Sequence, residues 1–218
     1  MGPAYERTIA VDTVIEIEVR KSRFMCSLVR VGNEQDARIA IDAVRRRHWD
    51  ANHHCTAWRI GAGGRLQRSN DDGEPAGTAG TPMLEVLHHR DLTDTLAIVT
   101  RYFGGTKLGA GGLIRAYGSA VSVAVNAAGV VERRPRHVIQ VAIGHSDSGR
   151  IENALRSSPF SLTEVTYNAD DVTFTLNVEP EERVPLARWL ADASSGRADL
   201  HETGVEFVEV PVPLLKGN

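Results

Sequence analysis

Five glycines lie close together between residues 104 and 112, in the segment RYFGGTKLGAGG, which also contains basic side chains. Glycine loses more conformational freedom on folding than any other residue, so such a cluster indicates tight turns or a close approach of the backbone to a ligand. Backbone amides, the positive end of a following helix and nearby cations together favour an anion such as phosphate. The candidate anion-binding or nucleic-acid-binding residues are Arg101, Tyr102, Gly104, Gly105, Lys107, Gly109, Gly112 and Arg115.

The same glycines have a purely structural interpretation. They would let the chain turn sharply and pack a small-residue helix against a sheet, and neither of the two common phosphate-loop patterns occurs in this segment. The neighbouring rings of Tyr102 and Phe103 could stack on unpaired bases or pack in the core. Because adjacent strand residues face opposite sides, at most one of the two is expected to face outward.

An acidic loop, Asp71, Asp72 and Glu74, is the second candidate site. Carboxylates could hold a magnesium ion against a substrate phosphate. Aspartates before glycine and proline also bond to their own backbone in turns, which explains the same residues without any ligand.

The sequence His53-His54-Cys55 contains residue types that ligate metals or act as nucleophiles. On an extended strand His53 and Cys55 share one face and His54 points to the other, so only two ligands would converge. We therefore expect no metal site and no cofactor, and we assign no catalytic residue.

The composition is that of an ordinary globular protein. Of the 218 residues, 42% are hydrophobic and 24% charged, and no apolar stretch approaches the length of a membrane span. The start of the sequence has no signal-peptide pattern, so we expect a cytoplasmic protein with no membrane partner. Two cysteines are too few for a disulfide framework and are expected to be free thiols.

The net charge of −3 conceals an asymmetry between the two parts of the chain. Residues 1–136 contain 19 Lys and Arg against 15 Asp and Glu, whereas residues 137–218 contain 6 against 13. A polyanion would therefore bind the first part, while the acidic second part could face a protein partner. An ordinary solvated surface explains the same counts, since the basic excess is small.

The elements that would position the glycine segment are an α/β set. Period-two alternation, helix caps and apolar runs predict strands at residues 11–19, 24–31, 53–60 and 96–100, and helices after Asn33, after Thr81 and from about residue 112. After residue 137 the pattern predicts strand, helix, two strands, helix and strand, which is the ferredoxin-like βαββαβ order. The segment ERRPR at 132–136 is the expected linker between domains 1–134 and 137–212.

Several long motifs closely resemble the YigZ/IMPACT family. They are KSRF at 21–24, HHCTAWRIG at 53–61, DDGEPAGTAGTPMLEVL at 71–87 and TRYFGGTKLGAGGLIRAY at 100–117. The sequence departs from the family pattern slightly, at Ala76 and Thr106.

This resemblance implies an N-terminal domain similar to domain IV of elongation factor G and to the second domain of a small-subunit ribosomal protein. It also implies a C-terminal domain similar to domain V of the same factor. Both of these relatives act on the ribosome, so the leading hypothesis is a non-enzymatic RNA- or ribosome-associated factor linked to translation. An enzyme that holds a phosphate ligand with the glycine and acidic loops, and a protein-interaction module, are the alternatives.

Overall fold

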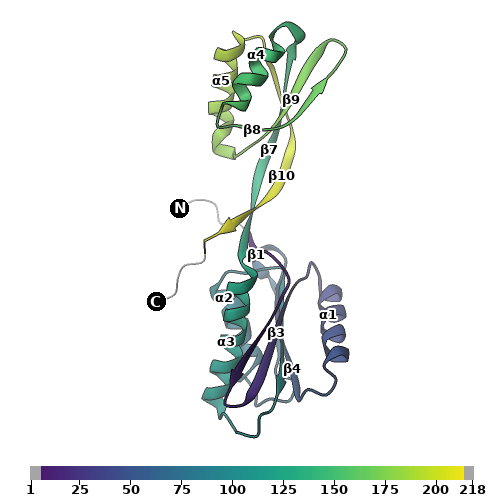
Figure 1. Cartoon of the computed structure of the whole chain (residues 1–218), viewed down its shortest axis with the longest axis vertical. Coiled ribbons are helices and arrows are strands. Elements are labelled where there is room, and N and C mark those ends of the chain that lie inside the picture. The colour runs from purple at the N-terminus through teal and green to yellow at the C-terminus, as the bar shows by residue number, and fades with distance from the viewer. Residues whose placement is uncertain (1–5, 214–218) are drawn as a thin grey trace. The chain divides into compact units, whose positions relative to one another are not determined.

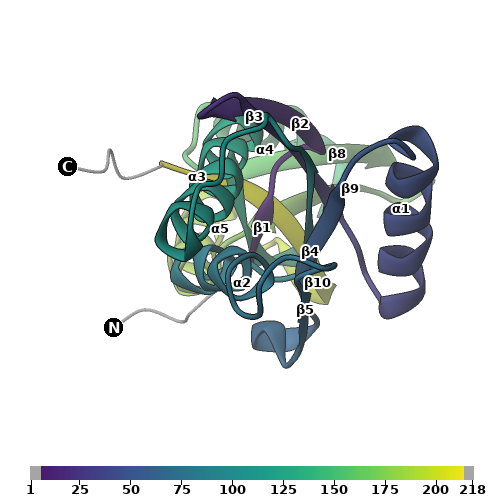
Figure 2. The same cartoon turned by 90° about the horizontal axis from the view of Figure 1, so that it is seen from below.

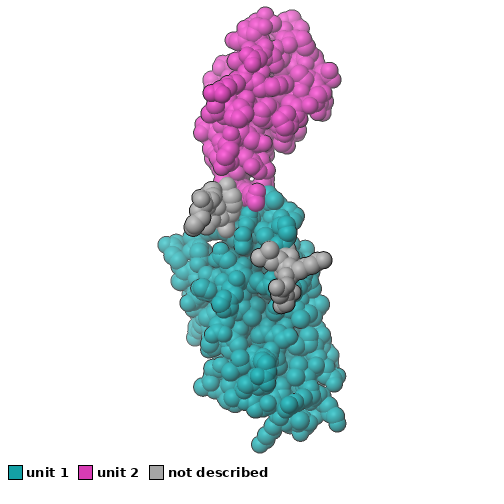
Figure 3. Space-filling view, turned by 90° about the vertical axis from the view of Figure 1, so that its left-hand side faces the viewer, with its two compact units in different colours: residues 1–133, 209–218 teal, residues 134–208 magenta. Residues whose placement is uncertain are grey.

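The computed structural model describes residues 6–213, which form two compact units. Unit 1 comprises residues 6–133 and 209–213, and unit 2 comprises residues 134–208 (Figure 3). In this division residues 209–213, which lie within the expected second domain, group with unit 1. The architecture is mixed α/β, as the sequence predicts.

Unit 1 is built on a five-stranded sheet in the order β2-β3-β6-β4-β5. Its neighbouring strands are antiparallel throughout. The alternation expected in the first strand is present, since the exposure of β2 residues alternates along its length. The strands span Thr13–Val19 (β2), Ser22–Arg30 (β3), His53–Ile60 (β4), Leu66–Asn70 (β5) and Thr95–Tyr102 (β6).

Three helices cover the two faces of this sheet, with α1 on one side and α2 and α3 on the other (Figure 2). They span Glu34–Arg47 (α1), Gly80–His89 (α2) and Ala110–Ala128 (α3). The larger core lies under α2 and α3, where small residues on α3 allow close packing and Tyr117 is fully buried. A smaller core lies under α1 and includes Trp58.

The predicted caps were only partly correct. Asn33 caps α1 as expected, since its side-chain oxygen accepts the Asp36 N–H at 2.9 Å. The second helix begins at Gly80 rather than after Thr81, because a carboxylate from the acidic loop binds the amides at its start. The strand β5 was not predicted, because its polar residues match no apolar pattern.

Unit 2 has the predicted βαββαβ order. Strands β9 and β8 follow β7 in the sheet, and β10 also pairs with β7. One face of the sheet packs on α4 and α5 around a core that includes Phe174. The elements are β7 (Val130–Gly144), α4 (His145–Arg156), β8 (Ser161–Tyr167), β9 (Asp171–Val178), a short 3-10 turn (Pro180–Glu182), α5 (Arg183–Ser194) and β10 (Asp199–Val212).

The segment 132–136 is part of β7 rather than an irregular linker. Strand β1 (Glu6–Ile9) pairs with β7 up to Arg133, and β9 pairs with it from His137 onward. Pro135, which has no N–H to donate, lies between the stretches of β7 that pair with β1 and with β9.

Neither described cysteine forms a disulfide, since Cys26 and Cys55 are both free and buried. Within residues 6–213, the helices are all too short or too polar to cross a membrane.

Candidate nucleic-acid interface

Three loops meet at one end of the unit 1 sheet, drawn at the bottom of Figure 1. They are the turn between β2 and β3, the loop between α1 and β4, and the glycine segment between β6 and α3. The strand register brings them together, because Arg23 at the start of β3 lies opposite Tyr102, and His53 at the start of β4 lies opposite Arg101. We call this region the basic end.

Four exposed cations belong to the basic end: Arg20, Lys21, Lys107 and Arg115. Arg20 and Arg115 line the same hollow of about 240 Å³, beside Leu108 and the first turn of α3. Among the residues that the structure describes, these four side chains form no ion pair. Unpaired cations around a hollow are an arrangement that attracts phosphate.

Arg20 and Lys21 were missed by the sequence analysis. Both have positive φ angles, 48° and 67°, because they form the two-residue turn of the β2–β3 hairpin. The gap between the predicted strands at 11–19 and 24–31 is the sequence signal that could have placed this turn, although Arg-Lys is not one of the usual hairpin-turn pairs.

Arg101 is buried, although the sequence analysis placed it among exposed phosphate-binding cations. Its Nη1 lies 2.6 Å from Glu74 Oε1, with side-chain exposures of 6% and 3% for the two residues. The Tyr117 hydroxyl donates to the same oxygen at 2.7 Å. This guanidinium is covered and already paired, so it connects the end of β6 to the acidic loop through Glu74.

Strand β6 ends at Tyr102, and Tyr102 and Phe103 differ in exposure. Tyr102 is half-buried and lies in a polar cluster, since the Arg23 guanidinium is 5.1 Å from its ring centre and His48 Nδ1 is 3.0 Å from its hydroxyl. Phe103 is 46% exposed. Phe103, which was not among the candidate residues, is therefore the outward-facing ring.

The glycines of the glycine segment are required for different physical reasons. Gly105 and Gly109 have φ angles of 82° and 74°, in the left-handed region. At Gly104 a Cβ atom would lie 2.0 Å from the Lys21 backbone, so this position requires close approach. Gly112 lies in the first turn of α3 and lines the hollow.

In the acidic loop, Asp71 and Asp72 are both bound by protein groups. Asp72 accepts the His54 N–H at 2.6 Å and pairs with Arg45 at 2.7 Å. Asp71 accepts the amides of Ala79 and Gly80 at the start of α2. With Glu74 held by Arg101, all three carboxylates have structural partners, and Glu74 contacts β6 and α3, the two elements that flank the glycine segment.

The carboxyl of Asp71 should make the free energy of unfolding depend on pH. Burial alone would raise the pKa of its carboxyl, but hydrogen bonds from Gly77, Gly80 and Ala79 outweigh that effect and hold the pKa below its ordinary value. A depressed folded-state pKa gives stability that is present above the unfolded value near pH 4 and is lost as pH falls through the folded value. We expect Asp71→Asn to lower the free energy of unfolding by about 1–2 kcal/mol at pH 7, because an amide NH₂ must then face an N–H donor.

Urea unfolding of both proteins at pH 7 and pH 3 measures this effect. The difference between wild type and Asp71→Asn should shrink at pH 3. The matched control is Asp42→Asn, an exposed residue of α1, which should change stability little at either pH. A deficit in Asp71→Asn that is equal at both pH values would contradict the assignment.

The buried Cys55 and Tyr117 lack the properties of catalytic groups. Burial raises the pKa of Cys55 to about 12 and raises the pKa of Tyr117 far above its ordinary range. Neither therefore ionises near neutral pH, and no thiolate nucleophile forms. Among residues 6–213, no three His, Cys, Asp or Glu side chains are grouped so that they could hold a metal ion.

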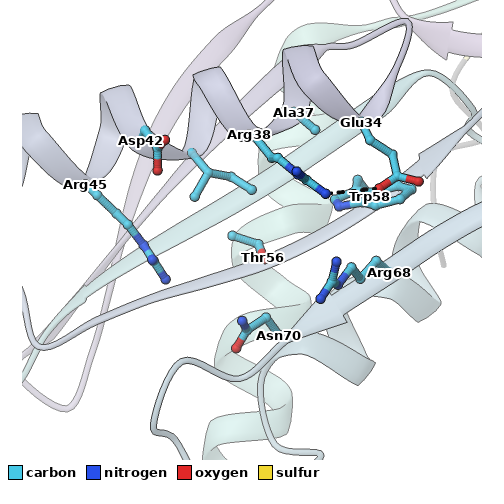
Figure 4. A pocket seen from close by; sticks show the side chains of 10 residues that line it. Glu34, Ala37, Arg38, Asp42, Arg45, Thr56, Trp58, Arg68 and Asn70 are labelled. Carbon is cyan, nitrogen blue, oxygen red and sulfur yellow. Dashed lines mark ion pairs between the residues drawn. The ribbon is translucent and has the colours of Figure 1, made fainter.

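A second hollow of about 280 Å³ lies between α1 and the neighbouring strands β4 and β5 (Figure 4). Its lining mixes acidic and basic groups, and two of its arginines already have partners: Arg38 is 3.8 Å from Glu34, and Arg45 pairs with Asp72. This mixed charge favours an anion less than the basic end does.

Comparison with known proteins finds one family match in each unit. The Impact N-terminal domain matches residues 20–125, and a domain of unknown function (DUF1949) matches residues 141–197. The chain is 47% identical to IMPACT family member YvyE of Bacillus subtilis (strain 168), over 92% of each chain. It is 46% identical to IMPACT family member YigZ of Escherichia coli (strain K12), over 52% of this chain and 56% of that protein.

A solved crystal structure described as that of a hypothetical protein has a similar fold, with a TM-score of 0.57 and 31% sequence identity. The similarity covers 91% of this chain and 97% of that one. The likeness to domains of elongation factor G stays a prediction. The motifs, both domain matches and the full-length relative agree, and the chain therefore belongs to the IMPACT family.

Proposed function

We propose that this protein is a non-enzymatic RNA- or ribosome-associated factor linked to translation, and that the basic end of unit 1 binds the RNA backbone. The observation that supports the proposal is the set of four exposed cations at one end of the sheet, Arg20, Lys21, Lys107 and Arg115. Two of them, Arg20 and Arg115, line one hollow. Arg101 is not one of the contacts. Its guanidinium pairs with Glu74 and so anchors the acidic loop.

The enzyme alternative is less well supported by this geometry. Asp71, Asp72 and Glu74 would have to bind a metal ion, but each carboxylate already has partners within the protein. The protein-interaction alternative places the partner on the acidic unit 2, and it is compatible with RNA binding by unit 1.

Charge removal at the basic end tests the proposal. We expect the variant with Arg20, Lys21, Lys107 and Arg115 all replaced by glutamine to bind ribosomal RNA at least about tenfold more weakly at 0.1 M salt. Each phosphate contact on a single strand contributes about 0.7 to the slope of log affinity against log salt. The slope should therefore flatten by up to about 3 when all four contacts are lost. Fluorescence anisotropy over a salt series measures both quantities, and co-sedimentation with ribosomes at two salt concentrations checks the effect on the native target.

The matched control replaces four exposed arginines elsewhere with glutamine, which changes the net charge by the same amount. These are Arg38, Arg65, Arg68 and Arg188. The control should keep most of the wild-type affinity and nearly the wild-type slope of log affinity against log salt. If the control loses binding and the basic-end variant does not, the interface lies elsewhere and the proposal fails.

A further inference from the structure

The basic end also exposes two large aromatic side chains. Trp49, in the loop between α1 and β4, is 81% exposed, and Phe103, in the glycine segment, is 46% exposed. Burying such rings normally contributes to folding, so leaving two of them in solvent at one end of a sheet calls for an explanation.

The backbone at Phe103 is anchored by hydrogen bonds. Its N–H donates to Asn52 Oδ1 at 2.8 Å, and the next amide, Gly104, donates to Ser22 Oγ at 3.2 Å. The Arg101 guanidinium is 5.5 Å from the ring centre, and Glu74 holds that guanidinium in turn. The Arg101 guanidinium thus packs on one side of the ring, while nearly half of the Phe103 surface faces solvent.

Trp49 lies in a loop whose residues before and after it form hydrogen bonds with the rest of unit 1. The carbonyl of His48 accepts the Ala51 N–H at 3.0 Å and lies 3.0 Å from His54 Nε2. The same loop is tied to the glycine segment, since the Asn52 N–H donates to the Arg101 carbonyl at 3.0 Å. The indole is therefore exposed on an anchored loop next to the one that presents Phe103.

The two rings lie at the sheet end together with the four cations. Exposed cations together with exposed aromatic rings are the combination that binds single strands, because every base has a face that can stack and every nucleotide has a phosphate. In a duplex the bases are already stacked on each other and are not available.

We propose that the basic end binds single-stranded RNA, with one unpaired base stacked on Phe103 and another stacked on Trp49. This inference rests on the proposed function, because Arg20, Lys21, Lys107 and Arg115 would hold the phosphates of the same strand. It adds a preference for unpaired nucleotides that charge alone does not provide.

Replacing the two rings with leucine or with another aromatic residue tests this stacking. Phe103→Leu and Trp49→Leu keep an apolar side chain but remove the stacking surface, and Phe103→Trp and Trp49→Phe keep an aromatic ring. The probe is a fluorescent 12-nucleotide RNA of mixed sequence, measured alone and annealed to its complement. We expect each leucine variant to bind the single strand about tenfold more weakly and the aromatic variants to bind nearly as well as wild type. Duplex affinity and the salt slope should not change.

Tyr167→Leu is the control, because this ring is 67% exposed but lies in unit 2. It should leave binding unchanged, and thermal unfolding should show that all of the variants are folded. If both leucine variants bind the single strand as tightly as wild type while binding still weakens with salt, base stacking is refuted but phosphate binding stands. If the leucine variants instead lose a protein partner captured from ribosomes and retain RNA, the rings are a protein contact and the inference is also refuted. A glutamine variant of the four cations with unchanged salt dependence would refute the proposed function itself.

Discussion

Glu74→Ala should lower the free energy of unfolding of unit 1 by about 3–5 kcal/mol, the effect of removing one partner from a buried ion pair. The change leaves the Arg101 guanidinium covered by protein without its carboxylate. It also removes the oxygen that accepts the Tyr117 hydroxyl. The Arg101 Nε already has no partner, so the remaining donors of this guanidinium cannot all be satisfied nearby.

Urea unfolding followed by hydrogen exchange and mass spectrometry measures this loss, because peptides from β3 and β6 report on unit 1 separately from unit 2. The double variant Glu74→Leu with Arg101→Met is the informative comparison. Apolar residues of similar volume often replace a buried ion pair at little cost, so the double variant should be more stable than Glu74→Ala. A Glu74→Ala protein as stable as wild type would show that the pair is accessible to water.

The same double variant separates positioning from binding. If Arg101 only fixes the loop, the folded double variant should still bind RNA with the wild-type salt slope, because all four exposed cations remain. A slope reduced by about 0.7 would instead show that Arg101 contacts a phosphate, as the sequence analysis first assumed.

The sequence predicted the elements better than it predicted the site. Period-two strands, the Asn33 cap and the βαββαβ order depend on local patterns, and the structure confirms them. Burial of Arg101 depends instead on Glu74, a residue 27 positions earlier, which no local pattern reveals. Arg101 and Lys107 look alike in the sequence, yet one is buried and the other exposed.

The acidic loop illustrates the same limit. Turn chemistry was one of the two explanations of Asp71, and its partners include the first amide of a helix that starts nine residues later. The Thr81-Pro82 pair suggested a later start, because the sequence does not show that a distant carboxylate caps the helix. In both cases the missing information is tertiary contact between charged or polar groups.

Gly104→Ala should be the most damaging small substitution at the basic end. A Cβ atom at this position would lie 2.0 Å from both the carbonyl carbon and the oxygen of Lys21, and 2.5 Å from the Ser22 amide. These are backbone atoms of the β2–β3 turn, so no side chain can rotate away. We expect a loss of at least about 3 kcal/mol in the free energy of unfolding, at the upper end of the range for overpacking.

The neighbouring glycine provides a control for this steric argument. Gly105 has a φ angle of 82°, but a Cβ there would meet nothing within 4 Å. Gly105→Ala should therefore show only the strain of a left-handed backbone, about 1–2 kcal/mol. Urea unfolding of the two variants, read from peptides of unit 1, compares them directly. Equal losses would mean that backbone conformation alone explains the glycine pair. A larger loss at Gly104 would show that this glycine is required where the glycine segment packs against the turn that presents Arg20 and Lys21.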